Sequence, residues 1–254
     1  MKKKTKLPIK VLLNHLKEYK DAVIILGPDI AHENVAVSED SKDKFNRKTM
    51  VRDPQSFWSY YAENLMKIFS YNDVTTETVE ALLDLNLHSS VIDTNIIDIL
   101  THTNVISPAG KNKTLRCVKC GKNHDAEPMY AQLRFQDTTL KCDCGGNIKP
   151  TVLCMGEKYP LNVYNEVKDA IFTEENGKVS LNTHTLIFIG VDFSDSLISE
   201  IIDSFDALKD NVHYSVIIAD KEHREDVIYY NPEFGVCDDI QQGVSRLIDL
   251  LKEE

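Results

Sequence analysis

The chain has 254 residues, of which 42% are hydrophobic and 27% charged, so it can bury the core of one large domain that carries a small insert. Its formal net charge of −11 repels the phosphates of nucleic acids, and we expect no nucleic-acid partner. The basic residues 1–6 precede no uninterrupted apolar segment, and no window is apolar enough to cross a bilayer. We therefore expect a cytoplasmic protein with no membrane contact.

Taken in chain order, apolar runs alternate with segments of helical spacing. The expected strands are the apolar runs at 21–27, 89–95, 183–192 and 213–220. The expected helices repeat apolar residues every three or four positions, at 9–19, 53–71, 75–87, 192–208 and 237–254. Strands that alternate with helices favour an α/β fold, with a Rossmann-like parallel sheet and helices on both of its faces.

Three of these helices carry capping signals at their starts. Asp53 precedes a proline, a pair typical of a helix N-terminus. Thr75 or Thr76 supplies a hydroxyl for the next helix, and the helix after the third strand has Asp192 or Ser194 as its cap.

Four cysteines form two close pairs, Cys117 with Cys120 and Cys142 with Cys144, and a glycine follows each pair. Glycine permits the positive φ that such tight turns need, so each turn can aim two thiolates at one metal ion. Four sulfurs close a tetrahedral zinc site and leave no position for water, so we predict a structural Zn²⁺. His124 is an alternative fourth ligand, because the second pair is more closely spaced than usual.

The cysteine pairs define a zinc-ribbon module at 113–149, inserted in a Rossmann-like domain of 1–112 and 150–254. The zinc should contribute to folding, because a short segment of loops and brief strands cannot hold itself together. Cys154 and Cys237 lie in apolar or mixed surroundings, and we predict that they are core residues rather than ligands.

The order of these features resembles that of the sirtuins, the family of NAD-dependent protein deacylases. The family's TQNIDGL motif is similar to "DTNIIDIL", and its second cysteine pair with the following R-P-x-V-V-x-F-G-E is similar to "CDCGGNIKPTVLCMGE". Its strands ending in GAGIS and G-T-S resemble "VIILGPDIA" and "LIFIGVDF". The resemblance covers nearly the whole chain and implies NAD as a cofactor and an acylated peptide or protein as a partner.

The resemblance also implies that the catalytic groups have changed. Ala109, which cannot accept a proton, stands where the family has its general-base histidine. Gly27 keeps the start of the phosphate-binding turn, but Pro28 after it removes a backbone donor. Asp29 and Asp192 add carboxylates where a pyrophosphate would lie.

Four residues match positions that contact the cofactor in the family: Gly27, Gly190, Asn95 and Asp98. The segment "DTNIID" fits two registers. One keeps Asn95 as the family's asparagine and loses the aspartate, and the other keeps Asp98 as the aspartate with Asn95 at the glutamine position. Neither register preserves both polar groups that the family uses around the nicotinamide.

Four further residues match the substrate groove of the family: Val152, Leu153, Gly156 and Glu157. The resemblance implies that the main chain of Val152 and Leu153 pairs with an acyl-lysine peptide by β-augmentation. The alternative is that these residues only pack the joint between the module and the sheet.

We therefore expect a sirtuin-like protein with a structural zinc and impaired catalysis, which acts as a binding or scaffold module. Loss of a general base costs about 10²- to 10⁴-fold in rate, and the added carboxylates weaken NAD binding. The alternative is a divergent NAD-dependent protein deacylase or ADP-ribosyltransferase with a displaced base, for which His102 is the candidate. A third reading is a structural partner in an oligomer with an empty cofactor cleft.

Overall fold

A six-stranded parallel sheet forms the centre of the molecule, in the order β3-β2-β1-β9-β10-β11. The computed structural model describes residues 9–31, 41–65, 74–102, 104–129, 140–154, 156–208 and 213–253. The strands of this sheet are β1 Ala22–Leu26, β2 His88–Asp93, β3 Val105–Ile106, β9 Thr185–Ile189, β10 Tyr214–Asp220 and β11 Phe234–Asp238. The chain builds outward from β1 in one direction and then from β9 in the other, so the loops after β1 and β9 diverge and open a crevice between them.

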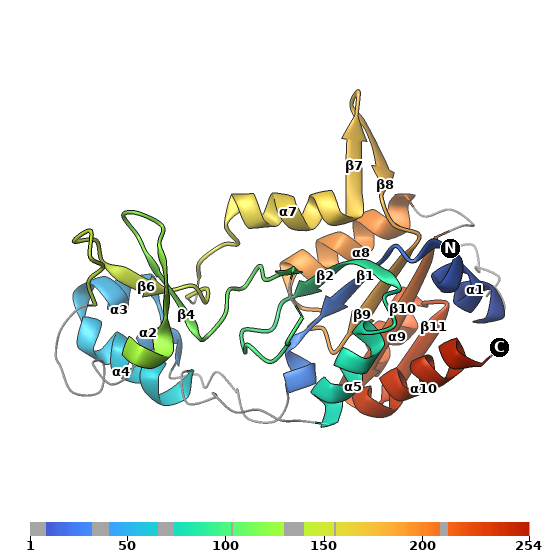
Figure 1. The fold of residues 1–254 in the computed structure, drawn as a ribbon, viewed down its shortest axis with the longest axis horizontal. Coiled ribbons are helices and arrows are strands. Elements are labelled where there is room, and N and C mark those ends of the chain that lie inside the picture. The colour runs from blue at the N-terminus through green and yellow to red at the C-terminus, as the bar shows by residue number, and fades with distance from the viewer. Residues whose placement is uncertain are drawn as a thin grey trace.

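Helices cover both faces of the sheet (Figure 1). One face packs against α1 Ile9–Tyr19, α5 Val74–Leu83 and α10 Ile240–Lys252. The other packs against α7 Leu161–Ile171, α8 Ser196–Leu208 and α9 Arg224–Tyr230. The central strand β1 serves both faces, because Ile24 and Leu26 join the first core and Val23 and Ile25 the second. The predicted Rossmann-like sheet with helices on both faces is thereby confirmed.

A smaller module lies beside the sheet at one end of the molecule (Figure 1). It contains a three-stranded antiparallel sheet in the order β5-β4-β6, and the helices α2, α3 and α4 pack there as well. Their bounds are α2 Ser41–Lys44, α3 Arg47–Arg52, α4 Pro54–Asn64, β4 Thr114–Cys117, β5 Asn123–Asp125 and β6 Ile148–Pro150. Phe57 and Tyr61 of α4 share one core with Leu115 and Ile148 of the small sheet. The helices thus pack with the segment predicted as the zinc-ribbon insert, whose boundaries stay a prediction.

The remaining elements are a β-hairpin and two 3₁₀ turns. The bounds are β7 Phe172–Glu175 and β8 Lys178–Leu181, which form a hairpin, and the 3₁₀ turns η1 Pro28–Ala31 and η2 Lys221–His223. Within the described ranges, no helix combines the length and the apolar character needed to cross a membrane.

The predicted helix starts agree with the structure at one position and differ at two. Asp53 caps α4 as predicted, because its side chain accepts the N–H of Ser56 at 3.2 Å. Since α5 begins at Val74, the two threonines predicted as its cap lie inside the helix, and that prediction was wrong. The cap of α8 is Asp195, whose carboxylate accepts the N–H of Leu197 at 2.7 Å, so the predicted caps Asp192 and Ser194 were also wrong.

Element lengths differ from the sequence expectation in two ways. The helix predicted at 53–71 ends at Asn64, and the predicted part at 66–71 lies outside the described residues. The helices α7 and α9 and the edge strand β11 were not predicted at all.

Glycine is required where the loops after β1 and β9 cross. A Cβ at Gly27 would lie 2.0 Å from the carbonyl oxygen of Gly190 and 2.3 Å from Cα of Val191. Gly190 has φ of +58°, and its own Cβ would lie 2.9 Å from the backbone nitrogen of Ile30. The two backbones therefore touch at the point where the crevice opens, with no space for a side chain.

We predict that Gly27→Ala lowers the melting temperature much more than Gly177→Ala, measured by thermal unfolding. The first substitution drives a methyl group into backbone, which typically costs about 1–3 kcal/mol or more. Gly177, in the turn between β7 and β8, has φ of +73° and no atom within 4 Å of the added Cβ, so it carries only the backbone strain. Equal losses of stability in the two variants would contradict the tight crossing.

Candidate functional site

Four cysteine side chains converge in the small module. The Sγ of Cys117 lies 3.5 Å from that of Cys144, and the Sγ of Cys120 lies 3.7 Å from that of Cys142. All four sulfur atoms lie within 4.8 Å of one another. Zinc–thiolate bonds of about 2.3 Å place tetrahedral sulfurs just under about 4 Å apart, so the cluster fits one zinc ion.

The turns that carry the cysteines depend on glycine. Gly121 and Gly145 have φ of +74° and +77°, the left-handed conformation that the sequence predicted for these turns. A Cβ at Gly146 would lie 2.7 Å from the Sγ of Cys117, so only glycine leaves room for the sulfur. Backbone N–H donation, chiefly from Cys120, lowers the pKa of the Cys117 thiol and favours the thiolate that zinc binds.

Three other side chains considered for this site lie outside the cluster. His124 is on β5, opposite Leu115 of β4, and is not one of the four clustered ligands. Cys154 is buried in the core of the module, where burial raises its pKa to about 12. Cys237 is a half-buried residue of the edge strand β11, opposite Ala219.

The crevice at the ends of β1 and β9 offers few backbone donors. The N–H of Asp29 donates to the carbonyl of Gly190 at 3.0 Å, and the N–H of Ile30 points back to the carbonyl of Gly27 at 3.4 Å. Pro28 has no N–H to donate. A phosphate at this turn would need donors that are already committed within the protein.

The two carboxylates predicted to oppose a phosphate both have protein partners. Asp29 lies 3.2 Å from Nε2 of His223, which follows β10, so the contact reaches across the end of β9. The other ring nitrogen of His223 lies 3.2 Å from Asp226. Asp192 accepts hydrogen bonds from both the N–H and the hydroxyl of Ser194, at 2.8 and 2.7 Å.

A buried ion pair lies at the carboxyl end of β2. The ammonium of Lys111 contacts the carboxylate of Asp93, and it also donates to the carbonyls of Asn95 at 2.9 Å and Ile97 at 3.3 Å. Asp93 is fully buried and the Lys111 side chain is 15% exposed. Burial raises the pKa of Asp93, while the attraction of Lys111 opposes that rise. Three acceptors satisfy the three N–H groups of the ammonium, which fixes Lys111 in place.

Asn95 and Asp98, which follow the carboxyl end of β2, lie in different environments. Asn95 is 2% exposed, its side-chain oxygen accepts the N–H of Ile97, and its Nδ2 is buried without a hydrogen-bond partner. Asp98 is exposed, and its N–H donates to the side chain of Asn112. An unpaired buried donor costs about 1–3 kcal/mol, so this amide suits a ligand that presents a carbonyl or another acceptor.

The loop that carries Ala109 is held against the segment after β6. The carbonyl of Ala109 accepts the N–H of Leu153 at 3.0 Å. The next residue, Gly110, has φ of +75°, and its Cβ would lie 2.1 Å from the carbonyl oxygen of Thr151. The hydroxyl of Thr151 donates to the carbonyl of Lys111 at 2.9 Å, so this loop and the segment at 151–153 are fixed together.

The structure does not bring His102 to this loop. Its Nε2 lies 3.4 Å from the carboxylate of Asp84, after the end of α5. Burial, and to a lesser degree the neighbouring His102, lower the pKa of His88, the first residue of β2. Asp93 is the last residue of that strand, and five steps of about 3.3 Å separate the two by roughly 16 Å. His102 therefore lies near the amino-terminal end of β2, whereas Lys111 and Asp93 lie at its carboxyl end.

The four residues predicted for the substrate groove lie on the segment between β6 and α7. Val152 is buried in the core of the module, and the N–H of Leu153 is already donated to Ala109. Glu157 accepts the N–H of Cys154 at 3.0 Å and pairs with Lys149 at 3.3 Å. Gly156 has φ of +80° with open space around its Cα, and Met155 lies outside the described residues. Pairing of this segment with a peptide stays a prediction.

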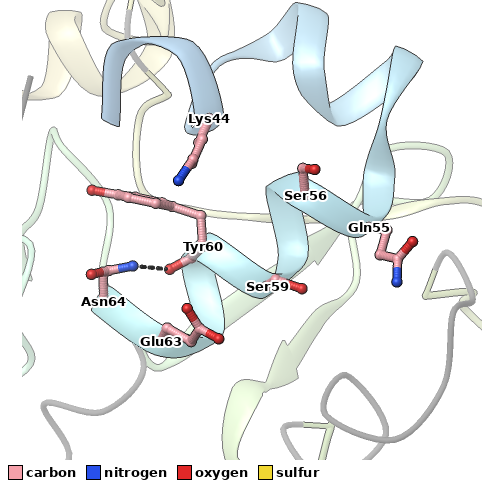
Figure 2. A pocket seen from close by; sticks show the side chains of 7 residues that line it. All are labelled: Lys44, Gln55, Ser56, Ser59, Tyr60, Glu63 and Asn64. Carbon is pink, nitrogen blue, oxygen red and sulfur yellow. Dashed lines mark hydrogen bonds between the residues drawn. The ribbon is translucent and has the colours of Figure 1, made fainter. Parts of the chain in front are cut away.

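A polar pocket of about 490 Å³ lies on α4, away from all these residues. Figure 2 shows Lys44 directed toward Tyr60, with Glu63 and Asn64 on the next turn of the helix. None of the residues predicted from the sequence as site residues lines it.

Two features of this site were missed by sequence reasoning, Asp93 and Lys111. The sequence shows an aspartate at the end of a buried strand and a lysine next to Gly110. It does not show that these two residues, 18 positions apart, form a pair.

We predict that Cys142→Ser abolishes stoichiometric zinc binding and lowers the melting temperature, because a structural zinc contributes directly to folding. The metal content per chain, measured by mass spectrometry after gel filtration, should fall from one zinc to well below one. Cys237→Ser is the matched control and should keep one zinc. Unchanged zinc content in Cys142→Ser would rule out the cysteine site.

We predict that Lys111→Met destabilises the protein by about 3–5 kcal/mol in chemical unfolding, because it leaves Asp93 buried without its partner. The double variant Asp93→Asn/Lys111→Met should recover part of this loss, since it removes the charge as well. Additive losses in the double variant would show that the two side chains do not interact.

A comparison with known protein families matches residues 29–186 to the Sir2 family. The NAD-dependent protein deacetylase of Haloarcula marismortui is 31% identical over 135 residues, which are 49% of this chain and 51% of that protein. The NAD-dependent protein deacylase 1 of Archaeoglobus fulgidus is 26% identical over 169 residues, 60% of this chain and 66% of that protein. The chain spans about half the length of the curated relatives it matches.

Solved structures agree with the fold over almost the whole chain. A structure of Sir2 bound to acetylated peptide has a TM-score of 0.73 at 18% identity, covering 96% of this chain and 98% of that one. A Sir2–p53 peptide–NAD⁺ structure has a TM-score of 0.71 at 17% identity, with the same coverage. Because the family match takes in more than half of the chain, and the sheet and the cysteine module agree with it, the chain belongs to the Sir2 family.

Proposed function

We propose that this chain is a zinc-stabilised sirtuin-fold binding or scaffold module in which NAD-dependent catalysis is strongly reduced. The observation that carries this proposal is Ala109, which stands at the family's general-base position and has no group that can accept a proton. Lys111, two residues later, cannot take over the role while its ammonium is held by Asp93 and two carbonyls.

The crevice supports weak rather than tight binding of NAD. The N–H groups of Asp29 and Ile30 are committed within the protein, and Pro28 has none. Asp29 and Asp192 bring negative charge to the side where a pyrophosphate would approach. Gly27, Gly190, Asn95 and Asp98 are the residues that would hold a dinucleotide, and NAD, when bound, would supply an ADP-ribosyl group.

The alternative function is a divergent NAD-dependent protein deacylase or ADP-ribosyltransferase. Asn95 favours it, because its buried Nδ2 suits an acceptor on a bound ligand. The names of the relatives, NAD-dependent protein deacetylases and a deacylase, favour it as well. This reading needs a base from elsewhere in the chain, and His102 suits that role poorly because it pairs with Asp84.

We propose a peptide or a protein as the partner, bound along the segment that contains Val152, Leu153, Gly156 and Glu157. Solved Sir2 structures with acetylated and propionylated peptides support this choice. With the N–H of Leu153 already donated to Ala109, pairing would rest on the remaining main-chain groups of the segment. Six cysteines without a disulfide suit the cytoplasm as the location.

We predict that Ala109→His increases the release of nicotinamide from NAD in the presence of an acetylated peptide, by about 10²- to 10⁴-fold if the base is the main defect. Ala109→Gln is the matched control, since it adds similar bulk without a group that titrates near neutral pH, and it should remain at the level of the unaltered chain. Thermal unfolding of both variants shows whether they are folded.

Two outcomes would overturn the proposal of reduced catalysis. One is efficient nicotinamide release by the unaltered chain. The other is release that is lost in His102→Ala while the fold is retained, which would favour the alternative with a displaced base.

A further inference from the structure

A groove of about 480 Å³ lies between the hairpin β7–β8 and the helices α7 and α8. Figure 1 shows the hairpin projecting from the body of the molecule beside the end of α7. Since β8 ends at Leu181 and β9 begins at Thr185, the groove lies at the amino-terminal end of β9, whereas Gly190 and the crevice follow its carboxyl end. The groove is therefore separate from the site described above.

One face of the hairpin runs from the core into the groove. Phe172 lies opposite Leu181, and both side chains belong to the core on this side of the sheet. Glu174 lies opposite Val179 on the same face, one step further out, and Val179 is 43% exposed. The side chain of Asn182 donates to the carbonyl of Phe172 at 3.0 Å. The base of the hairpin is thus fixed, and its outer half presents an apolar side chain to the groove.

Apolar side chains line the groove from the helix side as well. Leu208, at the end of α8, is 38% exposed, and Ala207 beside it is also exposed. The volume lies within the range of about 300–1,000 Å³ that binding sites commonly have. Exposed apolar side chains that gather around a hollow are typical of an interaction surface.

The rim of the groove is acidic. Asp169 and Glu174 line it, and neither carboxylate forms an ion pair with a described cation. Asp169 lies in the last turn of α7, where the helix dipole disfavours a negative charge. Lys168 also lines the groove, but its ammonium lies over the ring of Tyr164, 5.5 Å from the centroid and one turn back along the helix. A cation from a partner would relieve the repulsion at this helix end.

We propose that this groove binds a segment of a partner protein in which an apolar side chain is flanked by lysine or arginine. The apolar side chain lies between Val179 and Leu208. The flanking cations pair with Asp169 and Glu174 at the rim. A basic segment suits this surface better than a second copy of the chain, because two copies that each carry a net charge of −11 repel one another. The surface does not depend on the proposed function of the crevice.

The test is fluorescence anisotropy with the unaltered, zinc-loaded chain and a fluorescein-labelled peptide, Gly-Lys-Arg-Leu-Leu-Arg-Lys-Gly. Saturable one-to-one binding is expected, and added salt should weaken it because the rim contacts are exposed to solvent. A peptide with serine in place of both leucines should bind at least about tenfold more weakly. A peptide with glutamate in place of the four basic residues should lose binding by at least the same factor.

Variants of the hairpin separate this groove from a general attraction of the acidic chain for basic peptides. Glu174→Lys should weaken binding at least about tenfold, and Glu175→Lys is the matched control, because Glu175 is on the opposite face, paired with Lys178. The control should stay within about twofold of the unaltered chain. Val179→Ser should also weaken binding, whereas Ile228→Ser, at an exposed position on α9, should not. Melting temperatures show whether each variant is folded.

Backbone ¹H–¹⁵N spectra of the unaltered protein provide a measurement that needs no variant. The peptide should shift the resonances of Val179 and Leu208. Shifts confined to residues 151–157 would overturn the groove and support the peptide site proposed above. Absence of saturable binding, equal weakening by Glu174→Lys and Glu175→Lys, or a dimer in gel filtration that Glu174→Lys dissociates would each overturn the groove as a site for a basic segment.

Discussion

The contact between the backbones at Gly27 and Gly190 is the constraint on which the arrangement of the crevice depends. A Cβ at either position would collide with the other loop, so the ends of β1 and β9 can meet only through main chain. This crossing places the turn after β1 directly over Gly190, which accepts the N–H of Asp29. The contact that forms the crevice therefore engages the N–H of Asp29, a backbone donor that an anionic ligand would need.

The second constraint is the joint between the sheet and the cysteine module. Tyr61 of α4 donates its hydroxyl to the carbonyl of Asn112 at 2.5 Å, and the Asn112 amide donates to the carbonyl of Leu65. The neighbouring Lys111 is bound to Asp93 at the end of β2. One short loop therefore ties the module to the sheet, and Ala109 is part of that loop. A loop held by these contacts keeps its backbone in place whichever side chain stands at position 109.

The large elements could be predicted from the sequence because their signals are local. The apolar run of β1 and the spacing of α1 depend on neighbouring residues, and both were confirmed. The cysteine cluster was predictable because glycine and cysteine spacing together require one turn geometry. The edge strand β11 could not be predicted, because Phe234–Asp238 is half exposed and contains a glycine and an aspartate, which are rare in strands. The pairing of Lys111 with Asp93 could not be predicted, because it depends on how two separate loops pack. The cap of α8 could not be predicted either, because three polar residues within four positions were candidates.

We propose that the fold and the metal cluster persist in a chain whose catalysis is strongly reduced. A closed set of four sulfurs is compatible with this division, because such a zinc holds structure and offers no position to a substrate. The most direct measurement is single-turnover release of nicotinamide by the unaltered, zinc-loaded chain at saturating NAD and acetylated peptide. We expect a rate at least about 100-fold below that of Ala109→His, while the zinc content stays at one per chain. A rate equal to or above that of the histidine variant would contradict it.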